Sequence, residues 1–434
     1  MSEMKPFQVI IMVVFGLAAL VGLFLFANFQ GFNSGVVPVG TVTIWGTLPE
    51  RPIQDALANL KQSHGELAKV TYTEKSLETF DVELSEAIAS GRGPDLLIIS
   101  QEQLVSEQNK IKLITSNATS ERNFRDTYVP ESELFLSGKG AYGIPFVLDP
   151  LMLYYNRTQL ASIGVASAPA TWEAVAGLSP ALTRLNASGG IDKSGVAFGT
   201  YQNIENARAV LSLFLLQAGY SVSERTLDGF QGTLTRPVGQ NFGTTPAVSA
   251  VGYYLQFANP SKTSYSWNTA IPSARQAFVA GDLGLYFGFA SEEPVITAGN
   301  PNLDFDMAPV PHPATSEARM TYGRLYAFAI PKASANATGA ERVAMQFTAR
   351  DVVSMLAHSL NMAPAQRALL TPAQGDLFEP VYFPQALVSR GWLSPAPAET
   401  DSLFATMVSS ITSGRQSASD AISTLDQALT AALR

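Results

Sequence analysis

The sequence contains no cysteine among its 434 residues. This absence excludes disulfide bonds, thiolate metal sites, cysteine nucleophiles and iron–sulfur clusters. Histidine is scarce as well: His64, His312 and His358 lie far apart in the sequence and form no His-Glu-x-x-His or His-x-His pattern. We therefore expect no metal ion and no other cofactor.

Motifs of catalytic chemistry are also missing. No Gly-x-Ser-x-Gly elbow is present to expose and activate a serine. Pairs of carboxylates such as Glu50 and Asp149 arise by chance in a chain with 36 acidic residues, so they do not indicate glycoside hydrolysis. We therefore expect that the protein is not an enzyme.

The composition indicates a folded protein of two parts. The chain is 46% hydrophobic and 15% charged, which favours a globular protein over a disordered one. Its length exceeds that of one ordinary core and suits two lobes. The formal net charge of −8 argues against nucleic acid as a partner.

Residues 7–29 form an uncharged apolar run that is long enough to cross a bilayer. The alternative is a cleavable signal peptide, whose apolar region would be shorter and would end at a small-x-small site. Lys5 precedes the run and no basic residue follows it before Arg51, so the positive-inside bias places the rest of the chain outside the cell. We expect residues 1–30 to be a cytoplasmic tip and single-pass transmembrane anchor, and residues 31–40 to be a flexible stalk on the extracytoplasmic side of the cell membrane.

After the stalk, apolar strands alternate with amphipathic helices. The pattern predicts strands at residues 42–45, 67–73 and 96–99, with helices at residues 52–63 and 80–88 between them. Such alternation is typical of a parallel sheet that is covered on both faces.

The order of the motifs that follow is more specific than any one of them. Residues 143–157 read GIPFVLDPLMLYYNR, and PATWEAV at residues 169–175 places Thr171 as a helix cap. The other motifs are GRGPD at 91–95, AFVAGDLGLYFGFA at 277–290, MAPVPHP at 307–313 and GRLYAFAIPKAS at 323–334. Together they resemble the family 1 extracellular solute-binding proteins of ABC importers, of the maltose-binding type.

The resemblance implies an α/β fold of the type II periplasmic-binding-protein class, in which two lobes close over a ligand. It divides the chain into a first lobe of residues 41–148 and 289–324 and a second lobe of residues 149–288 and 325–434. The implied function is that of a monomer that captures a small solute, above all a sugar or oligosaccharide, and delivers it to the permease subunits of an ABC transporter. A ligand-sensing or scaffold protein with the same fold and no transport role is the alternative.

Candidate ligand-binding residues are polar or aromatic side chains at strand ends and crossings, where open α/β sheets bind ligands. Aromatic faces stack on sugar rings, and carboxylates or amides bind hydroxyls. Tyr154 and Tyr155 point to opposite sides of a strand, so only one can face the cleft. Packing in the core, a turn or a structural ion pair are the alternatives for several members of the set. The candidates are Trp45, Gln101, Asp149, Tyr155, Tyr201, Asn203, Trp267, Phe289 and Arg324.

Overall fold

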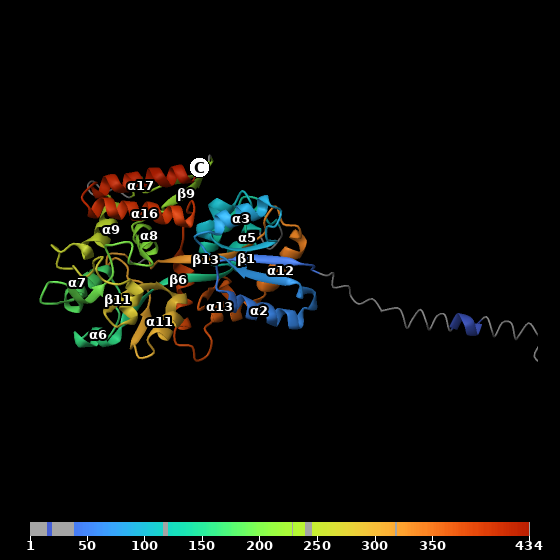
Figure 1. The fold of residues 1–434 in the computed structure, drawn as a ribbon, viewed down its shortest axis with the longest axis horizontal. Helices are drawn as coiled ribbons and strands as arrows, with labels where there is room; N and C mark the ends of the chain where they lie inside the picture. The colour runs from blue at the N-terminus through green and yellow to red at the C-terminus, as the bar shows by residue number, and fades with distance from the viewer. Residues whose placement is uncertain are drawn as a thin grey trace, which may run out of the picture.

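The computed structural model describes residues 15–19, 39–115, 120–227, 229–238, 245–316 and 319–433. It has two α/β lobes that share one 11-stranded sheet (Figure 1). The order of strands along the main path is β2-β1-β3-β13-β6-β11-β8-β7. The two-lobed α/β fold implied by the sequence is therefore confirmed.

The first lobe contains the parallel strands that the sequence predicts. Its strands are β1 (Val42–Gly46), β2 (Val70–Glu74) and β3 (Leu96–Ser100), and β1 pairs in parallel with both of the others. β2 begins later than predicted because residues 65–67 form a 3-10 turn. The helices are α2 (Glu50–Ser63), α3 (Phe80–Ala89), α4 (Leu104–Glu107), α5 (Glu121–Thr127), α12 (Ala337–Phe347) and α13 (Arg350–Leu360).

Successive residues of β3 belong to two different hydrophobic cores. Leu97 and Ile99 pack in the cluster that includes residues of α3. Leu96 and Ile98 pack in the cluster with residues of α2, α12 and α13. Since side chains alternate across a strand, these helices cover opposite faces of the sheet, as Figure 1 shows. Burial on both faces explains why β3 is apolar throughout.

Two strands carry the chain between the lobes. The first part of β6 (Ile144–Asn156) pairs with β13 (Thr321–Ala329) as far as Pro150, and its second part, from Leu151, pairs with β11 (Leu283–Phe289). Proline has no N–H to donate, so it suits a position where one ladder gives way to another. The predicted lobe boundary after residue 148 lies two residues before this change of partner.

The second lobe is built on the far part of β6. Its strands β7 (Arg184–Leu185), β8 (Ile191–Val196) and β12 (Phe305–Ala308) extend the sheet, and β9 (Ser223–Thr226) and β10 (Gly229–Gly232) form a hairpin. The helix α8 (Ala207–Gln217) is buried along almost all of its length, and the Thr171 side chain caps α7 (Trp172–Leu182) as predicted. The other helices are α6 (Arg157–Ser162), α9 (Pro246–Leu255), α10 (Ala274–Val279), α11 (Glu293–Gly299), α14 (Glu379–Tyr382), α15 (Gln385–Val388), α16 (Pro397–Thr412) and α17 (Ala418–Ala432).

The structure differs from the expected division of the later part of the chain. We expected residues 289–324 in the first lobe, yet β12 pairs with residues Leu153–Asn156 of β6 in the second lobe. We expected residues 325–434 in the second lobe, yet α12 contacts β1 and β3, and α13 contacts α2. The reason is that β13 pairs with β3 and carries the chain into the first lobe before the helices begin. The chain then returns to the second lobe, where α14 contacts β12, α16 contacts α17, and α17 contacts β10 and α9.

No helix among the described residues is both long and apolar enough to span a membrane. The predicted anchor, residues 7–29, lies outside the described residues except for residues 15–19, which are helical.

Candidate functional site

The junction of the two lobes contains a buried glutamate that follows β3. A capping box between Ser100 and Gln103 ends the strand and starts a short 3-10 turn. Glu102 lies in this turn and is 1% exposed. Because its backbone is held by the cap, its carboxylate has a defined position at the end of the first-lobe sheet.

Cations from the second lobe and from the crossing strand converge on this carboxylate. Nη2 of Arg208, on α8, donates to Glu102 Oε2 at 2.9 Å, and Nε of Arg324, on β13, lies 3.3 Å from the same oxygen. The Tyr322 hydroxyl donates to Glu102 Oε1. Burial alone would raise the pKa of Glu102, but Arg208 and Arg324 outweigh it and hold this pKa at about 2. The junction is therefore joined by a charged network in its present conformation.

The network continues towards solvent through α16. Asp401 Oδ1 lies 3.4 Å from Arg208 Nε and accepts a hydrogen bond of 2.8 Å from the Tyr201 hydroxyl. Beside these groups is a cavity of about 410 Å³ between the loop before α8 and the first turns of α16. We call it the α16 groove; its polar and aromatic lining is Tyr201, Gln202, Glu205, Arg208, Asp401 and Ser402.

The segment before α16 crosses from one lobe to the other. Its strand β15 (Ser389–Arg390) pairs with β13. The Trp392 indole donates to Ser212 of α8 at 3.0 Å, and the Ser394 hydroxyl donates to the Glu102 carbonyl at 2.8 Å. This segment therefore ties the Glu102 turn to the second lobe independently of the ion pairs.

Comparisons with known proteins agree on the class of protein. The family model for bacterial extracellular solute-binding proteins matches residues 52–349. This chain belongs to that family. None of the curated proteins matches it closely enough to count as a relative.

Solved structures share the fold at low sequence identity. The cyclic alpha-maltosyl-1,6-maltose binding protein from Arthrobacter globiformis is 17% identical with a TM-score of 0.72, over 91% of this chain and 98% of that one. The GacH receptor of Streptomyces glaucescens is 18% identical with a TM-score of 0.67, over 91% and 98%. The Thermus thermophilus maltotriose binding protein is 13% identical with a TM-score of 0.66, over 91% and 100%.

Four of the residues predicted for the ligand cleft of this solute-binding protein lie at the junction. Arg324 pairs with Glu102, and its guanidinium lies 4.4 Å from the centre of the Phe289 ring. Tyr201 lines the α16 groove. Asp149 accepts hydrogen bonds from the backbone and hydroxyl of Ser291. Burial raises the pKa of Asp149 to about 7 despite these bonds.

The other predicted residues have structural surroundings. Gln101 is fully buried and bonds through both side-chain polar atoms to the backbone of β13. Trp267 is also fully buried, and its indole donates to Asn203, whose amide donates to the carbonyls of residues 268 and 271. In this conformation these three residues hold the core and its loops, in contrast to the cleft position that we predicted.

Trp45 and Tyr155 lie apart from the network. Trp45 is half-buried at the end of β1, where the Lys75 ammonium lies 4.1 Å from its ring centre. Tyr155 is six residues beyond Asp149 along β6, about 20 Å for an extended strand, and its hydroxyl donates to Asp306 of β12. Tyr155 therefore lies in the outer part of the second lobe.

Sequence reasoning left Glu102, Arg208 and Asp401 out of the candidate set. Arg208 carries a usable signal, because it is a lone charge in an otherwise apolar helix and a buried charge requires a partner. Glu102 follows an apolar strand, as ligand-binding residues of α/β sheets do. Asp401 has no such signal, since it lies on an amphipathic helix almost 200 residues beyond Arg208.

Proposed function

We propose that this solute-binding protein captures a carbohydrate at the lobe junction, with the α16 groove as its point of entry, and delivers it to an ABC importer. The observation that carries the proposal is the lining of the groove. Tyr201 provides an aromatic ring, and Gln202, Glu205, Asp401 and Ser402 provide groups that bond to hydroxyls. A few directed polar groups beside ring surface suit a neutral polyhydroxylated ligand. Among the similar structures, the GacH receptor is in complex with acarbose and the Thermus thermophilus protein is bound with maltotriose.

Arg208 gives such a ligand a link to the movement of the lobes. Its Nη1 is buried and has no hydrogen-bond partner among the described residues, while its other nitrogens face Glu102 and Asp401. A ligand oxygen that accepted from Arg208 would satisfy this donor and would compete with ion pairs that now join the lobes. Ligand binding would then shift the balance between lobe arrangements.

The test is calorimetric titration with maltotriose, longer maltodextrins and acarbose. Asp401→Asn should weaken carbohydrate binding by about 1–3 kcal/mol, roughly 5- to 150-fold, because it removes a charged acceptor that lines the groove. The matched control is Asp55→Asn, an equally simple change of an exposed aspartate on α2. The proposal is wrong if no carbohydrate binds, or if Asp401→Asn binds as tightly as Asp55→Asn.

We further propose that residues 1–30 anchor the protein in the cell membrane and leave the lobes on the extracytoplasmic side. The support is the uncharged run at residues 7–29 and the absence of basic residues between it and Arg51. The mature protein should fractionate with membranes and retain its N-terminus in mass spectrometry. A mature N-terminus beyond residue 27 would contradict the anchor.

A ligand-sensing or scaffold role without transport is the second candidate. It is favoured by the internal network, because the Glu102–Arg208 contact joins the lobes through protein side chains. Small-angle scattering distinguishes the two. A transport protein should change its radius of gyration on saturation with sugar, whereas a permanently closed scaffold should not.

A further inference from the structure

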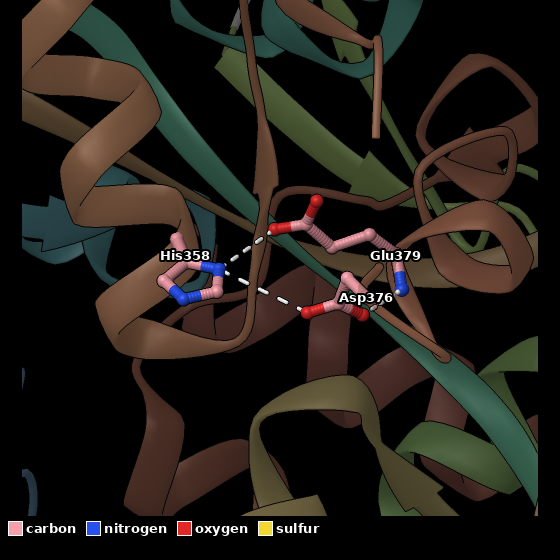
Figure 2. A group of neighbouring side chains, drawn as sticks. All are labelled: His358, Asp376 and Glu379. Carbon is pink, nitrogen blue, oxygen red and sulfur yellow. Dashed lines mark hydrogen bonds and ion pairs between the residues drawn. The ribbon is translucent and has the colours of Figure 1, made fainter. Parts of the chain in front are cut away.

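A second group of ionisable side chains lies far from Glu102 in the chain. His358 is in the last turn of α13, Asp376 is in the following loop, and Glu379 begins α14. Figure 2 shows both carboxylates turned towards the same edge of the His358 ring. His358 Nδ1 lies 3.1 Å from Glu379 Oε1 and 3.9 Å from Asp376 Oδ2, and all three donor atoms lie within 4.8 Å of one another.

The backbone holds each carboxylate in this orientation. Glu379 Oε2 accepts from the N–H of Ala373, which leaves Oε1 directed at His358. Asp376 Oδ1 accepts from the N–H groups of Phe378 and Glu379, which leaves Oδ2 directed at the same ring. Each carboxylate thus has one oxygen bonded to the protein and one oxygen turned to a common point, as metal ligands with outer-shell support do.

The His358–Glu379 separation matches that between two ligands of one ion, and Asp376 lies slightly farther away. Metal–nitrogen and metal–oxygen bonds of about 2.1 Å place neighbouring donors about 3.4 Å apart in a tetrahedral site and about 3.0 Å apart at right angles. The His358–Glu379 separation of 3.1 Å lies between these values, and the His358–Asp376 separation of 3.9 Å is longer than both, so Asp376 would move closer to the ion. We propose that His358, Asp376 and Glu379 form a binding site for one divalent transition-metal ion, with Zn²⁺ as the best fit.

The chemistry of the donor set supports this choice of ion. Imidazole favours Zn²⁺ and its first-row neighbours, whereas Ca²⁺ and Mg²⁺ are bound by oxygen ligands alone. The burial is graded: the exposed fractions of the His358, Asp376 and Glu379 side chains are 61%, 21% and 2%. The open side at His358 admits the ion and leaves room for water in the remaining coordination position.

The site would connect the two lobes. α13 contacts α2 of the first lobe, while α14 contacts β12 of the second. Phe378, between Asp376 and Glu379, stacks on Phe305 of β12 with ring planes 6° apart. An ion at this point would therefore fix the segment in which the chain passes from α13 back to the second lobe.

The probes are Co²⁺ and Zn²⁺ added to the full chain, purified in detergent without a histidine tag and treated with chelator. One equivalent of Co²⁺ should give a visible d–d absorption band, and one equivalent of Zn²⁺ should abolish it. Zn²⁺ should also raise the melting temperature, since an ion that binds only the folded state stabilises it. The cysteine-free sequence removes thiolates as competing ligands.

His358→Asn is the decisive variant because the side chain is 61% exposed, and we expect the variant to fold. It should weaken Zn²⁺ binding by more than about tenfold, as should Asp376→Asn. The matched control is His64→Asn, which removes a histidine that faces a single carboxylate, Glu66, at 3.4 Å. A chain that binds no stoichiometric Co²⁺ or Zn²⁺, or a His358→Asn variant that binds as well as His64→Asn, would overturn the proposal.

Discussion

Two buried glutamates of the first lobe stand in opposite electrostatic surroundings. Glu102 contacts two arginines and a tyrosine hydroxyl, and its pKa is lowered to about 2. Glu131, in the 3-10 turn Pro130–Phe135, has no hydrogen-bond partner for either carboxyl oxygen among the described residues. Burial raises the pKa of Glu131 to about 8, although Arg390 lowers it. Both side chains are nearly inaccessible to solvent, so direct partners and not depth of burial decide which glutamate is charged.

The comparison explains how the lobe junction is held. The charge on Glu102 makes it an anchor for Arg208 of the second lobe, whereas a neutral Glu131 can lie against the backbone of Gly323 and Gly391. A side-chain carbon added to either glycine would come within 2.5 Å of a Glu131 oxygen, so the glycines permit this approach. One glutamate joins the lobes through charge, and the other fills space beside the crossing strands.

Removing the Arg208 cation from Glu102 should have the largest effect on stability. Arg208→Met leaves Glu102 buried with one of its two ion-pair partners gone, and we expect a loss of about 3–5 kcal/mol in the free energy of unfolding in urea. Arg51→Met is the control, because its ion pair with Asp55 is exposed and should change stability by less than about 1 kcal/mol. The double variant Glu102→Gln/Arg208→Met should lose less than the sum of the single variants. Additive losses would show that the two groups do not act together.

Much of the fold was predictable because burial leaves a pattern in the sequence. The strands β1 and β3, the helices α2 and α3 and the cap at Thr171 all follow from local runs of apolar and capping residues. The lobe to which α12 and α13 belong was not predictable in this way, since it depends on the pairing of β13 with β3. Strand pairing is a long-range contact, and the apolar pattern of one strand does not predict which strand it pairs with.

The candidate site was predictable only in part for a similar reason. Arg324 and Phe289 were predicted because they flank a crossing, and they lie against each other at the lobe junction; their contact with a ligand stays a prediction. Trp267 is fully buried. A tryptophan in a loop near a crossing is equally suited to a cleft and to a core, and its burial and its hydrogen bond to Asn203 distinguish the two positions. The His358 cluster was missed because 17 residues separate the histidine from Asp376, and no local pattern spans that loop.

The neutral Glu131 should make the stability of the protein depend on pH. A carboxyl whose pKa is higher in the folded state than in the unfolded state binds an extra proton on folding. The contribution of Glu131 to the free energy of unfolding is complete below its pKa in the unfolded state. It is lost as the pH rises towards the folded-state pKa of about 8, at up to about 1.4 kcal/mol per pH unit. Asp149, with a pKa of about 7, acts in the same direction. The free energy of unfolding of the wild type, measured in urea, should therefore decrease from pH 6 to pH 8.

Glu131→Gln isolates the contribution of this one group. Glutamine is neutral at every pH, so the variant should show a shallower decline between pH 6 and pH 8 and should exceed the wild type in stability at the upper end. Glu133→Gln, a change at an exposed glutamate in the same turn, is the control and should leave the slope unchanged. Equal slopes for Glu131→Gln and the wild type would mean that Glu131 is ionised in the folded protein, and the contrast with Glu102 would fail.

The smallest effect should come from the hydroxyl that donates to the charged glutamate. Tyr322→Phe keeps the buried ring and removes one hydrogen bond to Glu102, for an expected loss of about 1–2 kcal/mol in the free energy of unfolding. Tyr201→Phe removes a similar bond to Asp401, whose side chain is 56% exposed, and water can replace that donor. Because only the buried carboxylate is left short of a donor, Tyr322→Phe should cost clearly more than Tyr201→Phe. Equal losses would show that the two arginines alone satisfy Glu102 and that the Tyr322 hydroxyl does not stabilise its carboxylate.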